Sequence, residues 1–151
     1  TRKTVPGWRI LDKYAVRIGG GHNHRFGLFD GVLIKDNHIS AAGSVGEAIK
    51  LVKGSVPHTL KIEVEVETLD ELKEAIDSGA DAVLLDNMDM NMLRKAVEIA
   101  KDRVIIEVSG GITLEDVGEI AKTGVDFISV GAITHSVKGV DISLELQRKG
   151  H

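Results

Sequence analysis

Cysteine is absent from the chain, and aromatic residues are scarce: one Trp, one Tyr and three Phe among 151 residues. Without cysteine there can be no disulfide, no thiolate metal site and no Cys nucleophile, which favours a reducing cytoplasm as the location. No apolar run approaches the roughly 18 residues that span a bilayer, so a membrane protein is not expected. With 42% hydrophobic residues and so few rings, the core is expected to be aliphatic.

An excess of positive charge is also lacking. The chain has 19 Lys and Arg against 23 Asp and Glu, which gives a net charge of −4. Such a balance provides no general attraction to nucleic acid or to an anionic membrane, so neither is expected as a partner. Clustered basic residues are therefore interpreted as parts of a local site. The length is typical of a single domain.

Two segments repeat each other almost position for position, residues 68–86 and 113–131. In the first, Thr68 and Glu71 form a capping box ahead of apolar residues at helical spacing, and Gly79 provides a left-handed helix end. In the second, Thr113 and Gly124 take the same roles. Each repeat therefore predicts one helix followed by one strand, and a further capped helix is expected from about Ser44 to Lys53.

Five short runs rich in Val, Ile and Leu predict the strands: Gly31–Lys35, Leu60–Val66, Ala82–Asp86, Val104–Val108 and Phe127–Gly131. Several are apolar without strict alternation, as in parallel strands covered on both faces. Strands that alternate with amphipathic helices imply a parallel sheet with right-handed crossovers. The predicted fold is α/β: an incomplete, open parallel α/β barrel, TIM-like, with about five or six βα units. A doubly wound sheet is the alternative.

A glycine-rich turn at one strand end predicts an anion site. Ser109, Gly110 and Gly111 precede a helix, so the backbone can approach an anion while amides at the helix start point toward it. Gly131, at the end of the next strand, could complete the cup. In barrels a phosphate commonly binds after the final strands. The alternative is that the glycines only form a tight turn.

Two carboxylates end neighbouring strands. Glu65 and Asp86 could share a ribose diol, or a Mg²⁺ ion with bound water, and Glu63 could join them from the same strand face. The alternative is a pair of carboxylates neutralised by Lys35 or Lys61. Proximity to the predicted phosphate cup favours a phosphosugar with a metal.

Five residues make up a basic group: Arg2, Lys3, His24, Arg25 and Lys35. Guanidinium groups bind carboxylates through two hydrogen bonds, whereas Lys acts as a point charge, so the mixture suits a small polyanion. Each could instead be a solvated surface charge. That alternative fits least well for Lys35, which ends an apolar strand.

A set of motifs then stands in order along the chain: Thr-Arg-Lys-Thr-x-Pro-Gly-x-Arg, Lys-Tyr-Ala-Val, Gly-Gly-Gly-x-x-His-Arg, Leu-Ile-Lys-Asp-Asn-His, Glu-Val-Glu-Val, Leu-Asp-Asn-Met, Ser-Gly-Gly-Ile and Gly-Val-Asp-x-Ile-Ser. Over essentially its whole length the chain resembles the quinolinate phosphoribosyltransferases, the carboxylating nicotinate-nucleotide pyrophosphorylases. Family members carry an N-terminal α/β domain before an incomplete α/β barrel. The resemblance implies that residues 1–151 are the barrel domain, without that N-terminal domain and most of the first barrel strand.

The resemblance also implies an activity. Phosphoribosyl pyrophosphate and quinolinate would react, with Mg²⁺, to give nicotinate mononucleotide, pyrophosphate and CO₂ in NAD biosynthesis. Four residues would hold the two carboxylates of quinolinate: Arg2, His24, Arg25 and Lys35. Four would hold the 5′-phosphate: Ser109, Gly110, Gly131 and His135.

Lys3 would lie near the pyrophosphate, and Glu65 and Asp86 would face the ribose hydroxyls and the metal. Together with Lys35, these three form the catalytic set that the resemblance implies. It further implies a homodimer or higher oligomer, in which the N-terminal domain of a neighbouring subunit supplies an Arg. The chain alone is then expected to hold the scaffold of the site without full activity.

Three other functions stay open at this point. A related phosphoribosyltransferase could use another acid or heterocycle. An isomerase or aldolase barrel would share the phosphate cup but needs an acid–base pair or a Schiff-base lysine, for which Lys35 is the candidate. A non-catalytic barrel fragment could act as a binding or assembly module.

Overall fold

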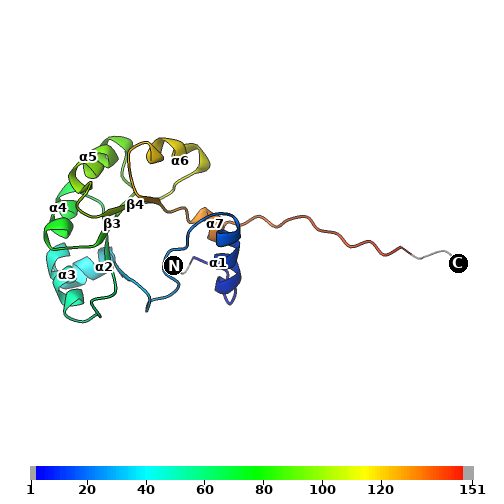
Figure 1. Ribbon diagram of the computed structural model, residues 1–151, viewed down its shortest axis with the longest axis horizontal. Coiled ribbons are helices and arrows are strands. Elements are labelled where there is room, and N and C mark those ends of the chain that lie inside the picture. Colours follow the sequence, from blue (N-terminus) through cyan, green and yellow to red (C-terminus); the bar gives the residue numbers. More distant parts are fainter. Residues whose placement is uncertain (1–2, 148–151) are drawn as a thin grey trace.

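The computed structural model describes residues 3–147 and contains one parallel sheet with helices around it (Figure 1). The five strands found in this part of the chain are β1 (Val32–Ile34), β2 (Ile62–Val66), β3 (Ala82–Asp86), β4 (Ile105–Ser109) and β5 (Phe127–Ile128). Their order in the sheet follows their order in the chain, and every neighbouring pair is parallel. The prediction of an open parallel α/β sheet is therefore confirmed, and each strand falls within its expected run except β4, which extends one residue further, to Ser109.

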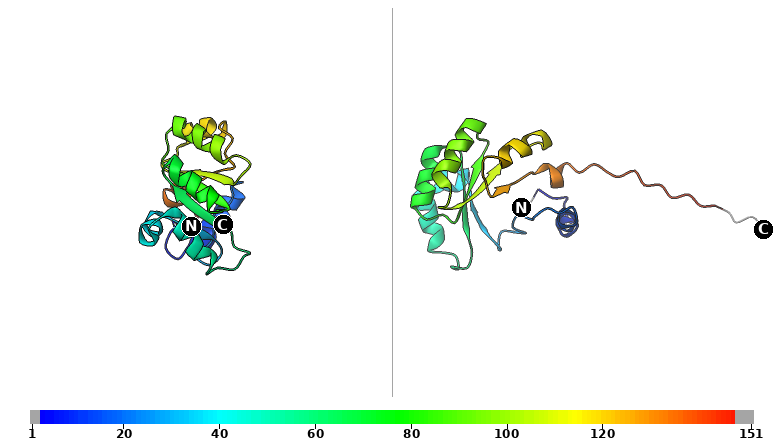
Figure 2. Two further views of the ribbon diagram at one scale, coloured as in Figure 1. Left: turned by 90° about the vertical axis from the view of Figure 1, so that its left-hand side faces the viewer. Right: turned by 45° about the horizontal axis from the view of Figure 1, so that its top comes forward.

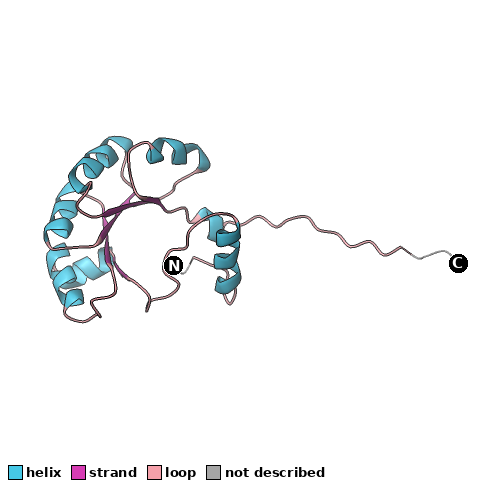
Figure 3. Cartoon of the chain, in the orientation of Figure 1, coloured by secondary structure: helices cyan, strands magenta, loops and turns pink. Residues whose placement is uncertain are grey.

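The helices are α1 (Arg9–Ile18), α2 (Asp36–Ala42), α3 (Val45–Lys53), α4 (Leu69–Asp77), α5 (Met90–Ala100), α6 (Leu114–Ala121) and α7 (Ala132–His135). Figure 3 shows α3, α4, α5 and α6 as an arc outside the strands, as in the outer ring of a barrel. Opposite that arc, α1 lies beside α7, next to the open side of the sheet (Figure 2). The helices α1, α2, α5 and α7 are additional to those located from the sequence.

Helix ends in the repeated segments form as predicted. The hydroxyl oxygen of Thr68 accepts from the Glu71 amide at 3.2 Å, and the Glu71 carboxylate accepts from the Thr68 amide at 3.1 Å. This capping box satisfies two amides that the first helical turn leaves without partners. Gly79 and Gly124 adopt φ angles of +80° and +93°, which explains why glycine follows both helices.

The aliphatic core fills the space between the sheet and the helical arc. Its completely buried side chains include Val64 and Leu85 from the strands and Ile49 and Leu72 from the helices. Burying a side chain of this kind contributes roughly 1.5–3 kcal/mol, so the helix-facing side of the sheet is fixed by these residues. Within residues 3–147, no helix combines the length and apolar character needed to cross a membrane.

Candidate active site

The inner, concave face of the sheet carries acidic side chains. In register, Glu65 of β2 stands beside Leu84 of β3, which stands beside Glu107 of β4. Residues level with each other in parallel strands point to the same face, and so do residues two apart on one strand. Glu63, Glu65 and Glu107 therefore share the concave face, while their apolar neighbours fill the core behind it.

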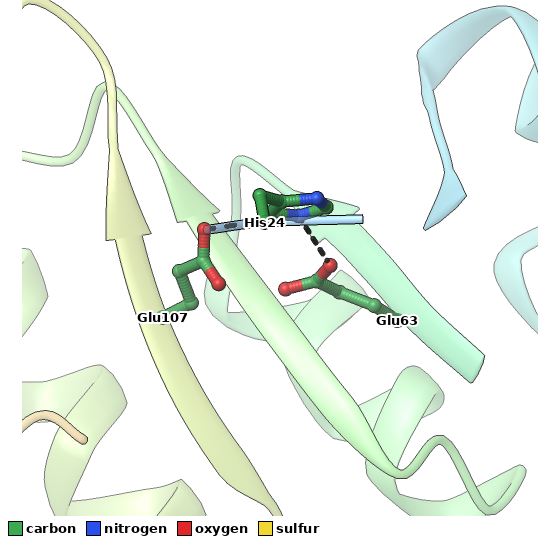
Figure 4. Close-up of side chains that lie close together, drawn as sticks. All are labelled: His24, Glu63 and Glu107. Carbon is green, nitrogen blue, oxygen red and sulfur yellow. Dashed lines mark hydrogen bonds and ion pairs between the residues drawn. The ribbon is translucent and has the colours of Figure 1, made fainter. Parts of the chain in front are cut away.

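His24 lies over this face and contacts two of the carboxylates (Figure 4). Its Nε2 atom is 3.1 Å from Glu63 Oε2 and 4.0 Å from Glu107 Oε1. The hydroxyl of Ser129 donates a hydrogen bond to the same Glu107 oxygen. We call His24, Glu63 and Glu107 the inner cluster. Glu63 thus pairs with His24, whereas Glu65, two residues further along β2, pairs with Lys35.

Burial of Glu107 changes its acidity. The residue is only 9% exposed, and it is the one charged residue counted as buried in residues 3–147. Removal from water disfavours the carboxylate, and the neighbouring charge of Glu63 adds to this, so the pKa of Glu107 is raised above its ordinary value. The hydrogen bond from Ser129 and the proximity of His24 oppose the rise without cancelling it.

Lys35 forms an ion pair with Glu65 at the end of β1. The Lys35 side chain is 46% exposed and that of Glu65 only 12% exposed, so the ammonium group covers the carboxylate from the solvent side. In this ligand-free arrangement Lys35 neutralises Glu65, as the alternative interpretation of the sequence proposed. The lysine amide also donates to His38 Nδ1 at 2.9 Å, which caps α2.

Arg25 is held at the start of the segment that leads into β1. Its guanidinium Nη1 donates to the Gly31 carbonyl at 2.7 Å, and its amide donates to His24 Nδ1 at 2.8 Å. Because His24 and Lys35 pair with Glu63 and Glu65 on one face of β2, the basic residues gather over one region. Arg2, the remaining member of the predicted acid-binding set, lies outside the described residues.

Asp86 ends β3 between the basic region and the glycine turn. It stands level with Ser109 of β4 and two residues beyond Leu84, the neighbour of Glu65. From strand rise and spacing, the Cα atoms of Glu65 and Asp86 are about 8 Å apart. The Asp86 carboxylate accepts from the side-chain amide of Asn87 at 2.6 Å. Bound water or a ribose could therefore bridge the two acids.

The glycine turn after β4 has the predicted backbone freedom. Gly110 and Gly111 have φ angles of +101° and +58°, and neither amide finds an acceptor within residues 3–147. The Thr113 amide, in contrast, is already bonded to the Asp116 carboxylate at 3.1 Å. An anion would therefore meet the two glycine amides first, whereas the expected contribution from the helix start is reduced.

Lys3, Gly131 and His135 lie together near the next strand end. A Cβ atom on Gly131 would be 2.8 Å from His135 Nε2 and 3.7 Å from Lys3 Cδ. A side chain at position 131 would therefore have to displace the exposed imidazole of His135. These residues come from opposite ends of the described chain; Gly131 and His135 belong to the predicted phosphate site, and Lys3 is the residue predicted near the pyrophosphate.

Two residues of the concave face were not anticipated as site residues. Glu107 lies in an otherwise apolar strand, and Ser129 follows β5. A single carboxylate inside an aliphatic run is costly to bury unless it has partners, and that pattern could have identified Glu107. Ser129 carries no comparable signal, because an isolated serine near a strand end is common.

Arg9, another residue of the N-terminal motif, makes structural contacts with Phe26. Its Nη1 donates to the Phe26 carbonyl at 3.3 Å, and its guanidinium carbon lies 5.7 Å from the centre of the Phe26 ring. A hollow of about 460 Å³ lies here, lined in part by Pro6 and Ile10. None of the predicted site residues lines it, so we attach the chemistry to the concave face instead.

Comparison with known proteins gives a consistent result. The family model described as quinolinate phosphoribosyl transferase, C-terminal domain, matches residues 1–145. A probable nicotinate-nucleotide pyrophosphorylase (carboxylating) of Bacillus subtilis is 51% identical over 146 residues, which cover 97% of this chain and 50% of the relative. A protein with the same description from Methanocaldococcus jannaschii is 52% identical, covering 98% and 54%.

Solved structures agree with the sequence comparison. The nicotinate-nucleotide pyrophosphorylase from Francisella tularensis matches with a TM-score of 0.91 and 53% identity, covering 97% of this chain and 52% of that one. The chain therefore spans about half the length of the relatives that it matches.

Proposed function

Because the chain belongs to the quinolinate phosphoribosyltransferase family, as its C-terminal domain model shows, we propose that it carries the barrel part of a carboxylating nicotinate-nucleotide pyrophosphorylase. The reaction would transfer phosphoribosyl from phosphoribosyl pyrophosphate to quinolinate, with release of pyrophosphate and CO₂. One observation carries the proposal. Basic residues, two carboxylates and a glycine turn follow each other along one rim, in the order of an acid, a ribose and a 5′-phosphate.

Quinolinate would bind at the basic end of this rim. Arg25 and Lys35 provide the positive charge, and His24 lies beside them over β2. Arg2 would complete the set. Positive charge at this place would also stabilise the carbanion that forms when a ring carboxylate leaves as CO₂, because opposite charge lowers the energy of that transition state.

The ribose and Mg²⁺ would lie at Glu65 and Asp86. Carboxylate oxygens suit Mg²⁺, which usually keeps several waters, and the separation of the two acids leaves room for such a shell. When bound, Mg²⁺ would neutralise the pyrophosphate leaving group. The two carboxylates themselves would stabilise positive charge on the sugar as its bond to pyrophosphate breaks. No side chain needs to act as a covalent nucleophile.

The phosphate end would use Ser109 and Gly110 together with Gly131 and His135, and Lys3 would lie near the pyrophosphate. Support comes from the amides of the glycine turn, which have no acceptor within residues 3–147, and from the proximity of Lys3 and His135 to Gly131. Backbone amides with positive φ form concave anion sites, and a nearby ammonium group adds charge.

Partner contacts form part of the proposal. The relatives are about twice as long as this chain, and α1 exposes large apolar side chains such as Trp8, Ile10 and Tyr14. An N-terminal domain, belonging to a second subunit of a homodimer or higher oligomer, would cover such surface and supply an Arg to the basic region. A cytoplasmic location remains a prediction based on the absence of cysteine.

Separate titrations test the proposed activity. Calorimetry with quinolinate, and then with phosphoribosyl pyrophosphate in the presence and absence of Mg²⁺, should show two binding events, of which only the second depends on the metal. Nicotinate mononucleotide should form when both ligands are present with a full-length relative's N-terminal domain. Binding of neither ligand would refute the proposal. Binding of phosphate esters without quinolinate would favour an isomerase or aldolase.

A further inference from the structure

The two carboxylates of the inner cluster, Glu63 and Glu107, lie one layer deeper on their own strands than Glu65 and Ser109, and His24 contacts both of them. Ser129 donates to Glu107, Glu63 accepts from His24, and Glu107 Oε1 lies 4.0 Å from the same imidazole nitrogen. One ring nitrogen of His24 and one carboxylate oxygen each of Glu63 and Glu107 lie within 4.8 Å of one another. Strands β5, β4 and β2 are thereby linked to the segment that precedes β1.

The position of the ring proton on His24 follows from its neighbours. The Arg25 amide donates to Nδ1 at 2.8 Å, so Nδ1 must be the acceptor nitrogen and Nε2 must carry hydrogen. That Nε2–H group then donates to Glu63 at 3.1 Å. The imidazole is thus fixed from both sides: by the backbone of Arg25 and by the carboxylate of Glu63.

We propose that Glu107 is a positioning residue for the quinolinate site: together with Glu63 it holds His24, and through His24 it orients the Arg25 backbone. This inference rests on the proposed function, since it assigns His24 and Arg25 to quinolinate. Glu107 itself touches no substrate in this arrangement, because it is buried beneath His24 and Glu63.

The contacts of Glu107 support this role. Its Oε1 atom accepts from Ser129 and lies 4.0 Å from His24 Nε2, so the side chain is held against the imidazole. Burial, with the neighbouring charge of Glu63, raises the pKa of Glu107 and so favours the form that does not repel Glu63.

Two substitutions at position 107 test whether Glu107 positions the quinolinate-binding residues. Glu107→Gln keeps the size of the side chain and an acceptor for Ser129, so the quinolinate dissociation constant of the chain should stay within about twofold. Glu107→Ala removes both and leaves Glu63 without its buried neighbour, so the affinity should fall roughly five- to a hundred-fold. Binding of inorganic phosphate at the glycine turn should change by less than about twofold in both variants.

Val108→Ala is the matched control. Val108 is the next residue on β4, is 4% exposed, and belongs to the apolar core on the other face. It should lower the melting temperature and leave the quinolinate affinity unchanged. The proposal is overturned if Glu107→Ala binds quinolinate as the parent does, if Glu107→Gln is as weak as Glu107→Ala, or if Val108→Ala loses the same affinity.

A ligand-free measurement distinguishes failure of this proposal from failure of the proposed function. Nitrogen-15 NMR of the His24 imidazole should show the Nε2–H tautomer in the parent and in Glu107→Gln, and a mixture of tautomers in Glu107→Ala. If quinolinate binds to none of these proteins, the function is wrong, and the NMR result still decides the positioning role. Identical His24 signals in all three would refute it.

Discussion

Alanine at Gly110 should damage both the stability of the fold and its anion site. The φ angle of +101° lies outside the left-handed region near +50° to +70° that other residues can enter. A Cβ atom would also lie 2.7 Å from the backbone nitrogen of Asn87. Strained backbone of this kind costs about 1–3 kcal/mol, and the collision must move Asn87 as well. We therefore expect a loss of about 3 kcal/mol or more.

Gly111 provides a matched control on the next residue. Its φ angle of +58° lies within the left-handed region, and a Cβ atom would meet nothing within 4 Å. Gly111→Ala should therefore cost only about 1 kcal/mol. At roughly 2–4 °C per kcal/mol for a chain of this size, the melting temperature should fall by about 2–4 °C for Gly111→Ala and by about 6–12 °C for Gly110→Ala.

Scanning calorimetry and a phosphate titration check both expectations. Gly110→Ala should also reduce phosphate affinity at least about tenfold, because the amide that faces the anion is displaced, whereas Gly111→Ala should change it less than about threefold. Equal melting temperatures for the two variants would refute the steric argument. Unchanged phosphate binding in a folded Gly110→Ala protein would remove the glycine turn from the site.

Three further predictions concern charged residues. The raised pKa of Glu107 means that its ionisation opposes folding as the pH rises from the ordinary glutamate range through the folded-state pKa. Glu107→Gln should therefore raise the melting temperature at pH 8, and the difference from the parent should vanish at pH 4. An equal gain in melting temperature at both pH values would contradict this prediction. Arg25→Ala should weaken quinolinate binding roughly ten- to a hundred-fold by calorimetry, with Arg17→Ala on α1 as a neutral control. Asp86→Asn should weaken Mg²⁺-dependent binding of phosphoribosyl pyrophosphate while quinolinate affinity stays within about twofold. Equal losses of affinity for both ligands would show that Asp86 is misassigned. Asp70→Asn is the control.

The fold could be predicted because its signals are local and repeated. The capping box at Thr68 and the glycines that end two helices lie within a few residues of the structure they specify. Aliphatic strands at regular spacing then restrict the topology to a parallel sheet. The helices α1, α2 and α7 do not begin after the Ser, Thr, Asp or Asn that usually marks a helix start. At α2 the ring of His38 instead accepts from the amide of Lys35.

The rim of the site was predictable for the same reason that the strands were. Residues directly after parallel strands must meet at one edge, so Lys35, Asp86 and the Ser109 turn could be grouped without a structure. What the sequence could not provide was the pairing between them. Whether Lys35 neutralises Glu65 or faces solvent depends on side-chain positions that strand spacing does not determine.

Glu63 and Glu65 illustrate why the sequence could not predict side-chain pairing. They lie two residues apart on one strand and one face, and their pattern in the sequence is the same. Glu65 is near the strand end, where the exposed Lys35 ammonium group can leave it for a ligand. Glu63 is one layer deeper, where His24 and the buried Glu107 hold it. A shift of two residues along β2 thus separates a carboxylate paired with an exposed lysine from one paired with an imidazole beside a buried glutamate. The difference arises from β4 and from the segment before β1, which no reading of β2 alone could supply.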